Sequence, residues 1–275
     1  MLPALDYHRP ATLEQACELL RDFGDEGVAL AGGTDVVVDL RRGAMGARHL
    51  VSLRELGELR GIRVEDGVLR IGALTTPAEL GAAAEIEAVR PELLDAVRGF
   101  AGPQIRNVAT VGGNLCTAAS CGDLAPMLIA LGASVRVVGP GGEREMALEE
   151  LFRDVRETVL ALGEILVEVA VPVRKPGEGA RYEAFGRRAA SFITVAGVAA
   201  YVRLADRYCR VVLGAVAPTP VVVPLEDTDI EKAAAAARAA ALPISDVRGS
   251  AEHRRDLVEV LTRRALRVAQ ERAQS

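Results

Sequence analysis

The sequence predicts an α+β protein, with a mixed, glycine-rich front half and a smaller back end of antiparallel strands and helices. Apolar residues recur at helical spacing, most clearly in TLEQACELLRDF at 12–23. Short apolar runs lie between such segments and indicate strands. Two long β-type runs at 193–204 and 208–223 are joined by a short turn, which is typical of an antiparallel pair.

The composition indicates a globular chain with an aliphatic core. The chain has 275 residues, enough for one large or two smaller domains, and half of them are hydrophobic. Aromatic residues make up 3% and the net charge is −5, which disfavours nucleic-acid binding. No apolar run approaches the ~18 residues of a membrane span, and the N-terminus does not resemble a signal peptide. We expect a cytoplasmic location, with peripheral attachment to the inner face of the membrane as the alternative.

Local signals set the order of elements in the front half. Thr12 is a suitable N-cap for the first helix, and Asp66-Gly67 is a typical bend for a hairpin. A Thr-Thr-Pro sequence at 75–77 marks another helix start, with either threonine as the cap. The predicted elements are helix 12–23, strand 28–33 running into a turn, helix 35–42, strand 49–53, hairpin 60–73, a helix from 75, and helix 91–101.

The second half is predicted in the same way. Asp123 is a natural N-cap for an apolar helix that closes on Gly132. The segment 171–185 is rich in Pro, Arg and Gly and marks a domain boundary. The predicted elements are helix 122–132, strand 134–139, strand 164–171, the two β-type runs, and helices over about 229–241 and 251–273. The last helix is expected to pack on the sheet, with a partner-subunit contact as the alternative.

Two glycine pairs follow short apolar stretches and are accompanied by hydrogen-bonding side chains. The first is AGGTD at 31–35, immediately before a predicted helix. Glycines let the backbone approach a ligand, and the first N–H groups of a helix are free to bind an anion. A purely structural turn is the simpler interpretation of this motif taken alone.

The second pair, Gly112-Gly113, changes that balance. Asn114 follows it and can both donate and accept hydrogen bonds, and Asp123 begins an apolar helix nine residues later, where it is either a plain cap or a ligand. Two such loops could clamp a diphosphate from both sides, which suits a dinucleotide. The chain contains no GxGxxG and no GxxxxGK[ST], so neither a Rossmann site nor a P-loop is supported.

Three segments together resemble one protein family. LAGGTDVVVDLRRG, IGALTTPAEL and QIRNVATVGGNLCTAASCGDLAPMLIALGA are similar, in order and spacing, to the FAD-binding medium subunits of the molybdenum hydroxylases. That family includes the medium subunit of aerobic carbon monoxide dehydrogenase and the flavin portion of xanthine dehydrogenase. The resemblance covers essentially the whole chain, and the long motif at 104–133 is its most specific part.

The resemblance implies the FAD-binding fold of the vanillyl-alcohol oxidase and para-cresol methylhydroxylase type. An FAD-binding domain would span 1–176, as two α+β subdomains with a break near 55–60, and a smaller C-terminal domain with an antiparallel sheet and helices would span 177–275. Backbone donors of the two glycine loops would hold the FAD diphosphate. The cofactor-binding residues that it implies are Ala31, Gly32, Gly33, Thr34, Asp35, Thr110, Val111, Gly112, Gly113, Asn114 and Asp123, with Ala73, Thr75 and Arg187 near the cofactor.

This chain departs from the family pattern at one place. A basic residue, matched here by Arg187 or Arg188, is often followed by an Asp, where this chain has Ser191. The resemblance therefore does not imply the corresponding salt bridge or flavin-edge contact for this chain. A solvated strand end is the alternative interpretation of the two arginines.

The resemblance also implies an electron-transfer role. In the family, the organic substrate is hydroxylated at a molybdenum cofactor on a large subunit, and [2Fe–2S] clusters on a small subunit pass electrons to FAD. The flavin, bound non-covalently, would pass them to NAD⁺, a quinone or oxygen. Both metal centres would lie on partner subunits only, and this chain would contain no catalytic residue and no metal ligand.

The cysteines agree with a chain that holds no cluster of its own. Cys17, Cys116, Cys121 and Cys209 lack the clustered spacing of an iron–sulfur site, and Cys116 is expected to pack as a small apolar residue close to the cofactor. Two alternatives remain for the chain as a whole. It could be a free-standing flavin oxidoreductase of the same fold, or a non-catalytic subunit that has lost FAD.

Overall fold

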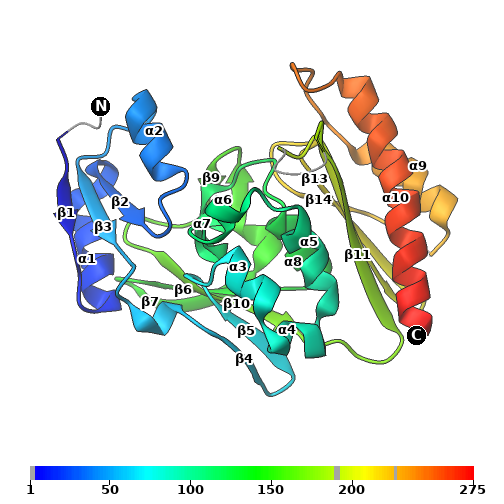
Figure 1. Cartoon of the computed structure of the whole chain (residues 1–275), viewed down its shortest axis with the longest axis horizontal. Coiled ribbons are helices and arrows are strands. Elements are labelled where there is room, and N and C mark those ends of the chain that lie inside the picture. The colour runs from blue at the N-terminus through cyan, green and yellow to red at the C-terminus, as the bar shows by residue number, and fades with distance from the viewer. Residues whose placement is uncertain (1–3, 189–192, 226–227) are drawn as a thin grey trace.

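The computed structural model describes residues 4–188, 193–225 and 228–275, and its main sheets and flanking helices confirm the predicted α+β class (Figure 1). The first sheet is parallel, with the strand order β1–β3–β2. Helices connect its successive strands. The elements are β1 (Asp6–His8), α1 (Leu13–Phe23), β2 (Gly27–Leu30), α2 (Val36–Arg42) and β3 (His49–Ser52).

Helix α1 shows why this part of the sequence could be predicted. Thr12 is its N-cap, and the threonine hydroxyl accepts the N–H of Gln15. The face with Leu13, Ala16 and Leu20 is buried against the first sheet and neighbouring strands. The start, the length and the buried face of this helix were all predicted.

A second, antiparallel sheet has the order β4–β5–β10–β6–β7. The predicted hairpin joins β4 to β5, and its bend residues Asp66 and Gly67 both have positive φ, at 50° and 76°, as a tight two-residue hairpin requires. A small hairpin of β8 and β9 precedes β10. The strands are β4 (Ile62–Glu65), β5 (Val68–Gly72), β6 (Ser134–Gly139), β7 (Gly142–Ala147), β8 (Phe152–Asp154), β9 (Glu157–Thr158) and β10 (Ile165–Pro172).

Short helices lie on one side of this sheet (Figure 1). The predicted helix at 91–101 is wrong in its length, because a 3-10 turn over Pro91–Leu93 precedes α5 and the helix ends at Gly99. Thr76 makes the capping box of α3 with Glu79. The helices are α3 (Pro77–Ala82), α4 (Ala84–Val89), α5 (Leu94–Gly99), α6 (Pro103–Arg106), α7 (Val111–Thr117) and α8 (Leu124–Ala130).

The back of the chain forms a third sheet with the order β11–β12–β13–β14, antiparallel throughout. Figure 1 shows α10 along one face of this sheet, while α5 and α8 lie on the other. The predicted run 208–223 is interrupted, because Ala215 adopts a positive φ of 64° and the strand resumes only at Val221. The elements are β11 (Glu178–Phe185), β12 (Ala196–Arg203), β13 (Tyr208–Gly214), β14 (Val221–Val223), α9 (Ile230–Ala240) and α10 (Ala251–Gln274).

The core is continuous across the second and third sheets. One buried cluster includes Leu69 and Leu128 from the front half together with Ala199 and Tyr201 from the third sheet. A second cluster lies between the third sheet and α9 and α10. Among the helices that are described, none is long and apolar enough to cross a membrane.

Candidate functional site

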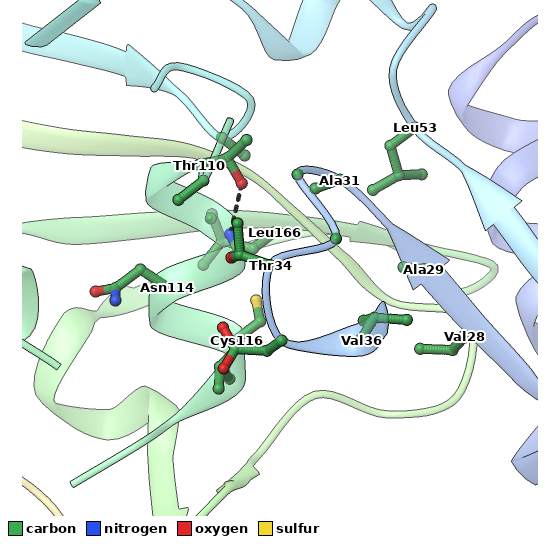
Figure 2. A pocket seen from close by; sticks show the side chains of 18 of the residues that line it. Val28, Ala29, Ala31, Thr34, Val36, Leu53, Thr110, Asn114, Cys116 and Leu166 are labelled. Carbon is green, nitrogen blue, oxygen red and sulfur yellow. Dashed lines mark hydrogen bonds between the residues drawn. The ribbon is translucent and has the colours of Figure 1, made fainter. Parts of the chain in front are cut away.

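A cavity of about 600 Å³ lies between the first and second sheets. Its size falls within the ~300–1,000 Å³ that is usual for small-molecule and cofactor sites. Figure 2 shows the loop after β2 on one side and α7 on the other. Residues of β10, Arg156 of the β8–β9 hairpin, and residues around Leu53, Ala73 and Phe100 also line the cavity.

The first glycine pair gives this cavity a row of free backbone donors. The N–H groups from Gly32 to Val36 donate to no acceptor within the described chain, and the first bonded amide is that of Val37, which donates to Gly33 O at 3.1 Å. Gly33 has a φ of +74°, so this turn favours glycine. Five successive unpaired amides ahead of a helix form an arrangement that binds anions.

The other glycine of this pair is required by a close backbone approach. A Cβ atom on Gly32 would meet Val108 O at 2.1 Å and Ala109 Cα at 3.0 Å. The loop after β2 therefore lies directly against the segment that leads into α7. The two glycine pairs are brought together, as the sequence predicted.

The second glycine pair differs from the prediction. It is the first turn of α7 and not a loop, because Thr110 is extended and caps the helix. The amide of Val111 donates to Thr75 O at 2.9 Å, and that of Gly112 to Ala73 O at 2.8 Å. Thr110 accepts the next two amides, from Gly113 through its hydroxyl at 3.0 Å and from Asn114 through its carbonyl at 2.9 Å. The expectation of free backbone donors from this side is therefore wrong.

Side chains on α7 face the cavity in place of those amides. Thr110, Asn114 and Cys116 are seen along this wall in Figure 2, and all three line the cavity. The Oδ1 atom of Asn114 is buried and has no hydrogen-bond partner in the described part of the protein. Such an atom costs about 1–3 kcal/mol unless a ligand or water satisfies it. Burial raises the pKa of the Cys116 thiol to about 12, so this side chain is neutral.

Two other predicted residues, Ala73 and Thr75, bind the first amides of α7 through their carbonyl groups. Ala73 lines the cavity, whereas Thr75 and the first residue of α7, Val111, are buried outside its lining. The Thr75 hydroxyl donates to Gly61 O at 3.2 Å, and its carbonyl accepts the Val111 amide. These residues fix the start of α7.

Asp123 does not cap α8 as predicted, because its side chain makes no capping hydrogen bond. Its Oδ1 accepts the Tyr182 hydroxyl at 3.0 Å and the Thr194 hydroxyl at 2.5 Å. Burial raises the pKa of Asp123 to about 6, and the two hydrogen bonds oppose that shift. The carboxylate lies outside the cavity lining and joins α8 to the third sheet; its contact with FAD stays a prediction.

Arg187 lies outside the cavity lining as well. Its Nη1 atom donates to Val247 O at 2.9 Å, and its side chain is exposed. Ser191, the departure from the family pattern, lies outside the described residues. A contact between Arg187 and the cofactor also stays a prediction.

Three charged residues of the lining were not predicted. They are Asp39 on α2, Arg156 between β8 and β9, and Glu164 before β10. Asp39 follows Asp35 by four residues on one helix face, which is a signal that the sequence offered. Glu164 is paired with Arg144 at 2.7 Å, and hydrogen bonding from this guanidinium lowers the pKa of the glutamate. No cluster of metal-ligating side chains is found within the described ranges.

These features fit the diphosphate of a dinucleotide cofactor. The free amides of the first loop supply donors for an anion, and glycine permits the backbone to approach it. The apolar lining, with Val28, Leu53 and Leu166, suits the flat rings of such a cofactor. The unpaired Asn114 oxygen could accept a hydrogen bond from a hydroxyl group of the cofactor.

Comparisons with known proteins agree with this geometry. Residues 3–174 match the family described as FAD binding domain in molybdopterin dehydrogenase, and residues 180–269 match the CO dehydrogenase flavoprotein C-terminal domain. The chain is 32% identical to the carbon monoxide dehydrogenase medium chain of Afipia carboxidovorans, over the whole of both chains. It is 34% identical to the xanthine dehydrogenase FAD-binding subunit of Escherichia coli O157:H7, covering 97% of this chain and 96% of the relative.

Solved structures resemble the whole chain. A chain of the Cu,Mo-CO dehydrogenase in its cyanide-inactivated form superposes with a TM-score of 0.94 at 31% identity, covering 99% of this chain and all of the other. A chain of quinoline 2-oxidoreductase from Pseudomonas putida 86 gives a TM-score of 0.90 at 26% identity, with both chains fully covered.

Proposed function

Because the chain belongs to the family of FAD-binding medium subunits of the molybdenum hydroxylases, we propose that it relays electrons within a multi-subunit dehydrogenase. It would receive them from [2Fe–2S] clusters of a small partner subunit and deliver them, through FAD, to NAD⁺, a quinone or oxygen. A large partner subunit would hold the molybdenum cofactor and act on the organic substrate. Several relatives carry names of this kind, such as the medium chain of carbon monoxide dehydrogenase.

One observation supports the proposal more than any other: the run of unpaired amides from Gly32 to Val36 that lines the cavity. In a protein that had lost its cofactor, a row of free donors and the buried Asn114 oxygen would remain without any hydrogen-bond partner. The alternative of a non-binding subunit is therefore disfavoured.

The chain itself would bind and orient the cofactor. The amides after β2 would hold its diphosphate, and Thr110 and Asn114 on α7 would contact its polar chain. FAD, when bound, supplies the redox chemistry, and the protein supplies position, electrostatics and exclusion of water. Asp123 and Arg187 are proposed as further contacts of the cofactor.

We also propose the division into an FAD-binding domain at 1–176, with two subdomains that separate near 55–60, and a C-terminal domain at 177–275. The separate first and second sheets and the two family matches support it. A cytoplasmic location is part of the same proposal.

The test is the colour and content of the purified full chain. We expect the visible absorbance of a flavin, and heat denaturation should release it into solution as FAD, because binding is non-covalent. A folded, colourless chain that takes up no added FAD would overturn the proposal. In the reconstituted complex, substrate should bleach the flavin only when both partner subunits are present. Turnover of an organic substrate by this chain alone would instead support the free-standing oxidoreductase.

A further inference from the structure

We propose that Arg156 sets the affinity of the cavity for FAD by neutralising the Asp39 carboxylate on the opposite wall. This inference rests on the proposed function, since it concerns the same cofactor site. Arg156 lies at the tip of the hairpin between β8 and β9, and it lines the cavity. Its guanidinium forms an ion pair with the Asp39 carboxylate on α2.

The backbone of Arg156 is held in an unusual conformation. Its φ is +60°, in the left-handed region that favours glycine over any residue with a side chain. Its amide donates to Ala118 O at 2.9 Å, at the end of α7. This conformation is that of a hairpin turn, and it holds Arg156 beside the cavity. Through its amide and its guanidinium, Arg156 connects α7 to α2.

The charges around the cavity explain what that side chain supplies. Among the described lining residues the ionisable ones of negative charge are Asp35, Asp39 and Glu164, and Arg156 is the sole cation. Glu164 already has a partner in Arg144. Asp35, at the N-cap of α2, and Asp39 lie one helical turn apart, next to the amides that would receive a diphosphate. Without Arg156, the Asp39 charge would repel that anion.

The acidic partner of this ion pair is buried enough for the loss of Arg156 to affect the cavity. The Asp39 side chain is only 13% exposed, so an unpaired charge there would be poorly solvated. Arg156 is about half exposed, which makes it accessible from the hairpin side. A surface pair on the same hairpin offers a matched contrast, because Arg153 and Glu157 are both more than half exposed and lie outside the cavity lining.

The experiment measures FAD affinity of the full chain, stripped of flavin and titrated with FAD, by quenching of FAD fluorescence. Arg156→Gln should raise Kd roughly tenfold, because it leaves the Asp39 charge unpaired. Arg153→Gln should stay within about twofold of wild type, because exposed pairs contribute little. The double variant Asp39→Asn with Arg156→Gln should recover most of the lost affinity.

Each contrary result has a distinct meaning. If Arg156→Gln binds FAD as tightly as Arg153→Gln, the inference is wrong while the proposed function stands. If the double variant stays as weak as Arg156→Gln, Asp39 is not what Arg156 neutralises and the inference is also wrong. If the folded wild type binds no FAD, the proposed function itself fails.

A second variant separates binding from folding. Arg156→Gly removes the side chain but suits the positive φ, so relief of the backbone conformation offsets part of the stability lost with the ion pair, and its thermal midpoint should be no lower than that of Arg156→Gln. Its FAD affinity should still fall as in Arg156→Gln. An unchanged affinity in this well-folded variant would contradict the inference.

Discussion

The glycine pairs at 32–33 and 112–113 have the same composition and line one cavity, yet their backbone N–H groups differ in whether they are already hydrogen-bonded. The amides that follow Gly32 are free, whereas those from Val111 to Asn114 are bonded within the protein. The residues that precede each pair explain the contrast. Thr110 is an extended N-cap that begins a helix at once, while Ala31 has no side chain that could cap one. The first pair thus remains a loop, and the second becomes a helix start.

This contrast changes how a diphosphate would be held. A clamp by amides from both sides is replaced by amides on one side and side chains on the other. The glycines of the second pair serve packing, since a Cβ on Gly112 would meet Ala73 Cβ at 2.7 Å. A glycine pair near a cavity is therefore no proof of an anion site. Its N–H groups can bind an anion only where they have no hydrogen-bond partner within the protein.

The largest expected effect comes from closing the space at Gly32. In Gly32→Ala the new methyl group would meet backbone atoms of Val108, which cannot rotate away. We expect a loss of about 3 kcal/mol or more in the free energy of unfolding, and loss of FAD binding, because the whole loop must shift. Denaturant unfolding and flavin content of the purified chain measure both.

Two further glycines are the controls for that variant. Gly46→Ala should be neutral, because no atom lies within 4 Å of the added methyl group and its φ is not positive. Gly113→Ala meets the Thr110 hydroxyl at 2.8 Å, a side chain that can move at the expense of its cap hydrogen bond, and alanine has the higher helix propensity, so it should cost at most about 1 kcal/mol. Equal losses in Gly32→Ala and Gly113→Ala would erase the difference between the two pairs.

The carboxylates after the glycine pairs provide the next test. Asp35 lines the cavity, whereas Asp123 is buried with a pKa of about 6. This folded-state pKa lies above the ordinary value of 3.8, so between pH 4 and pH 6 the folded chain binds more protons than the unfolded chain. The contribution of Asp123 to stability is therefore greatest at low pH and is lost as the pH rises through 6.

Asp123→Asn should remove that dependence. The difference between the ordinary pKa of 3.8 and the folded-state pKa of about 6 corresponds to about 2–3 kcal/mol. The amide oxygen can still accept the hydroxyls of Tyr182 and Thr194, so the variant should unfold less readily than wild type at pH 7 and equally at pH 4. Urea unfolding at the two pH values measures this; a constant difference between variant and wild type would show that Asp123 does not titrate in this range.

Local signals allowed much of the fold to be predicted from the sequence. Thr12 and the apolar face of α1 define that helix, and Asp66-Gly67 defines the hairpin. The strand, loop and helix around Gly32 and Gly33 were also predicted from neighbouring residues. In each case the residues that determine the structure lie within a few positions of one another.

Long-range partners could not be predicted in this way. Asp123 is drawn from the cap of α8 by Tyr182 and Thr194, which lie 59 and 71 positions further along the chain. Arg156 and Asp39 are 117 positions apart, and the positive φ of Arg156 at the hairpin turn has no signature in the sequence. The first two amides of α7 donate to the carbonyl groups of Thr75 and Ala73, and only the tertiary structure specifies this pairing.

Substitution of Asn114, the α7 side chain that faces the cavity where free amides were expected, should have a smaller effect on FAD affinity and stability. Asn114→Leu removes a buried oxygen that has no partner in the protein described. The flavin-free chain should therefore be as stable as wild type, or up to about 1 kcal/mol more stable. FAD affinity should fall roughly tenfold, which corresponds to about 1.4 kcal/mol. Fluorescence titration and thermal unfolding measure the two quantities.

Asn107→Leu is the matched control for that variant. Asn107 is exposed at the end of α6 and lies outside the cavity lining. The change should leave FAD affinity within about twofold of wild type. If Asn114→Leu behaves in the same way, α7 does not contact the cofactor through this side chain.

The two threonines of the glycine segments give the smallest and most direct contrast. Thr110 accepts the Gly113 amide, so Thr110→Val removes a helix cap and should cost about 1 kcal/mol of unfolding free energy. Thr34 makes no hydrogen bond within the described protein, so Thr34→Val should change stability by less than about 0.5 kcal/mol. Both variants keep the shape of the side chain, which isolates the hydroxyl group. Thermal unfolding without flavin should therefore separate them, and equal midpoints would mean that the cap of α7 contributes no more than a residue of a free loop.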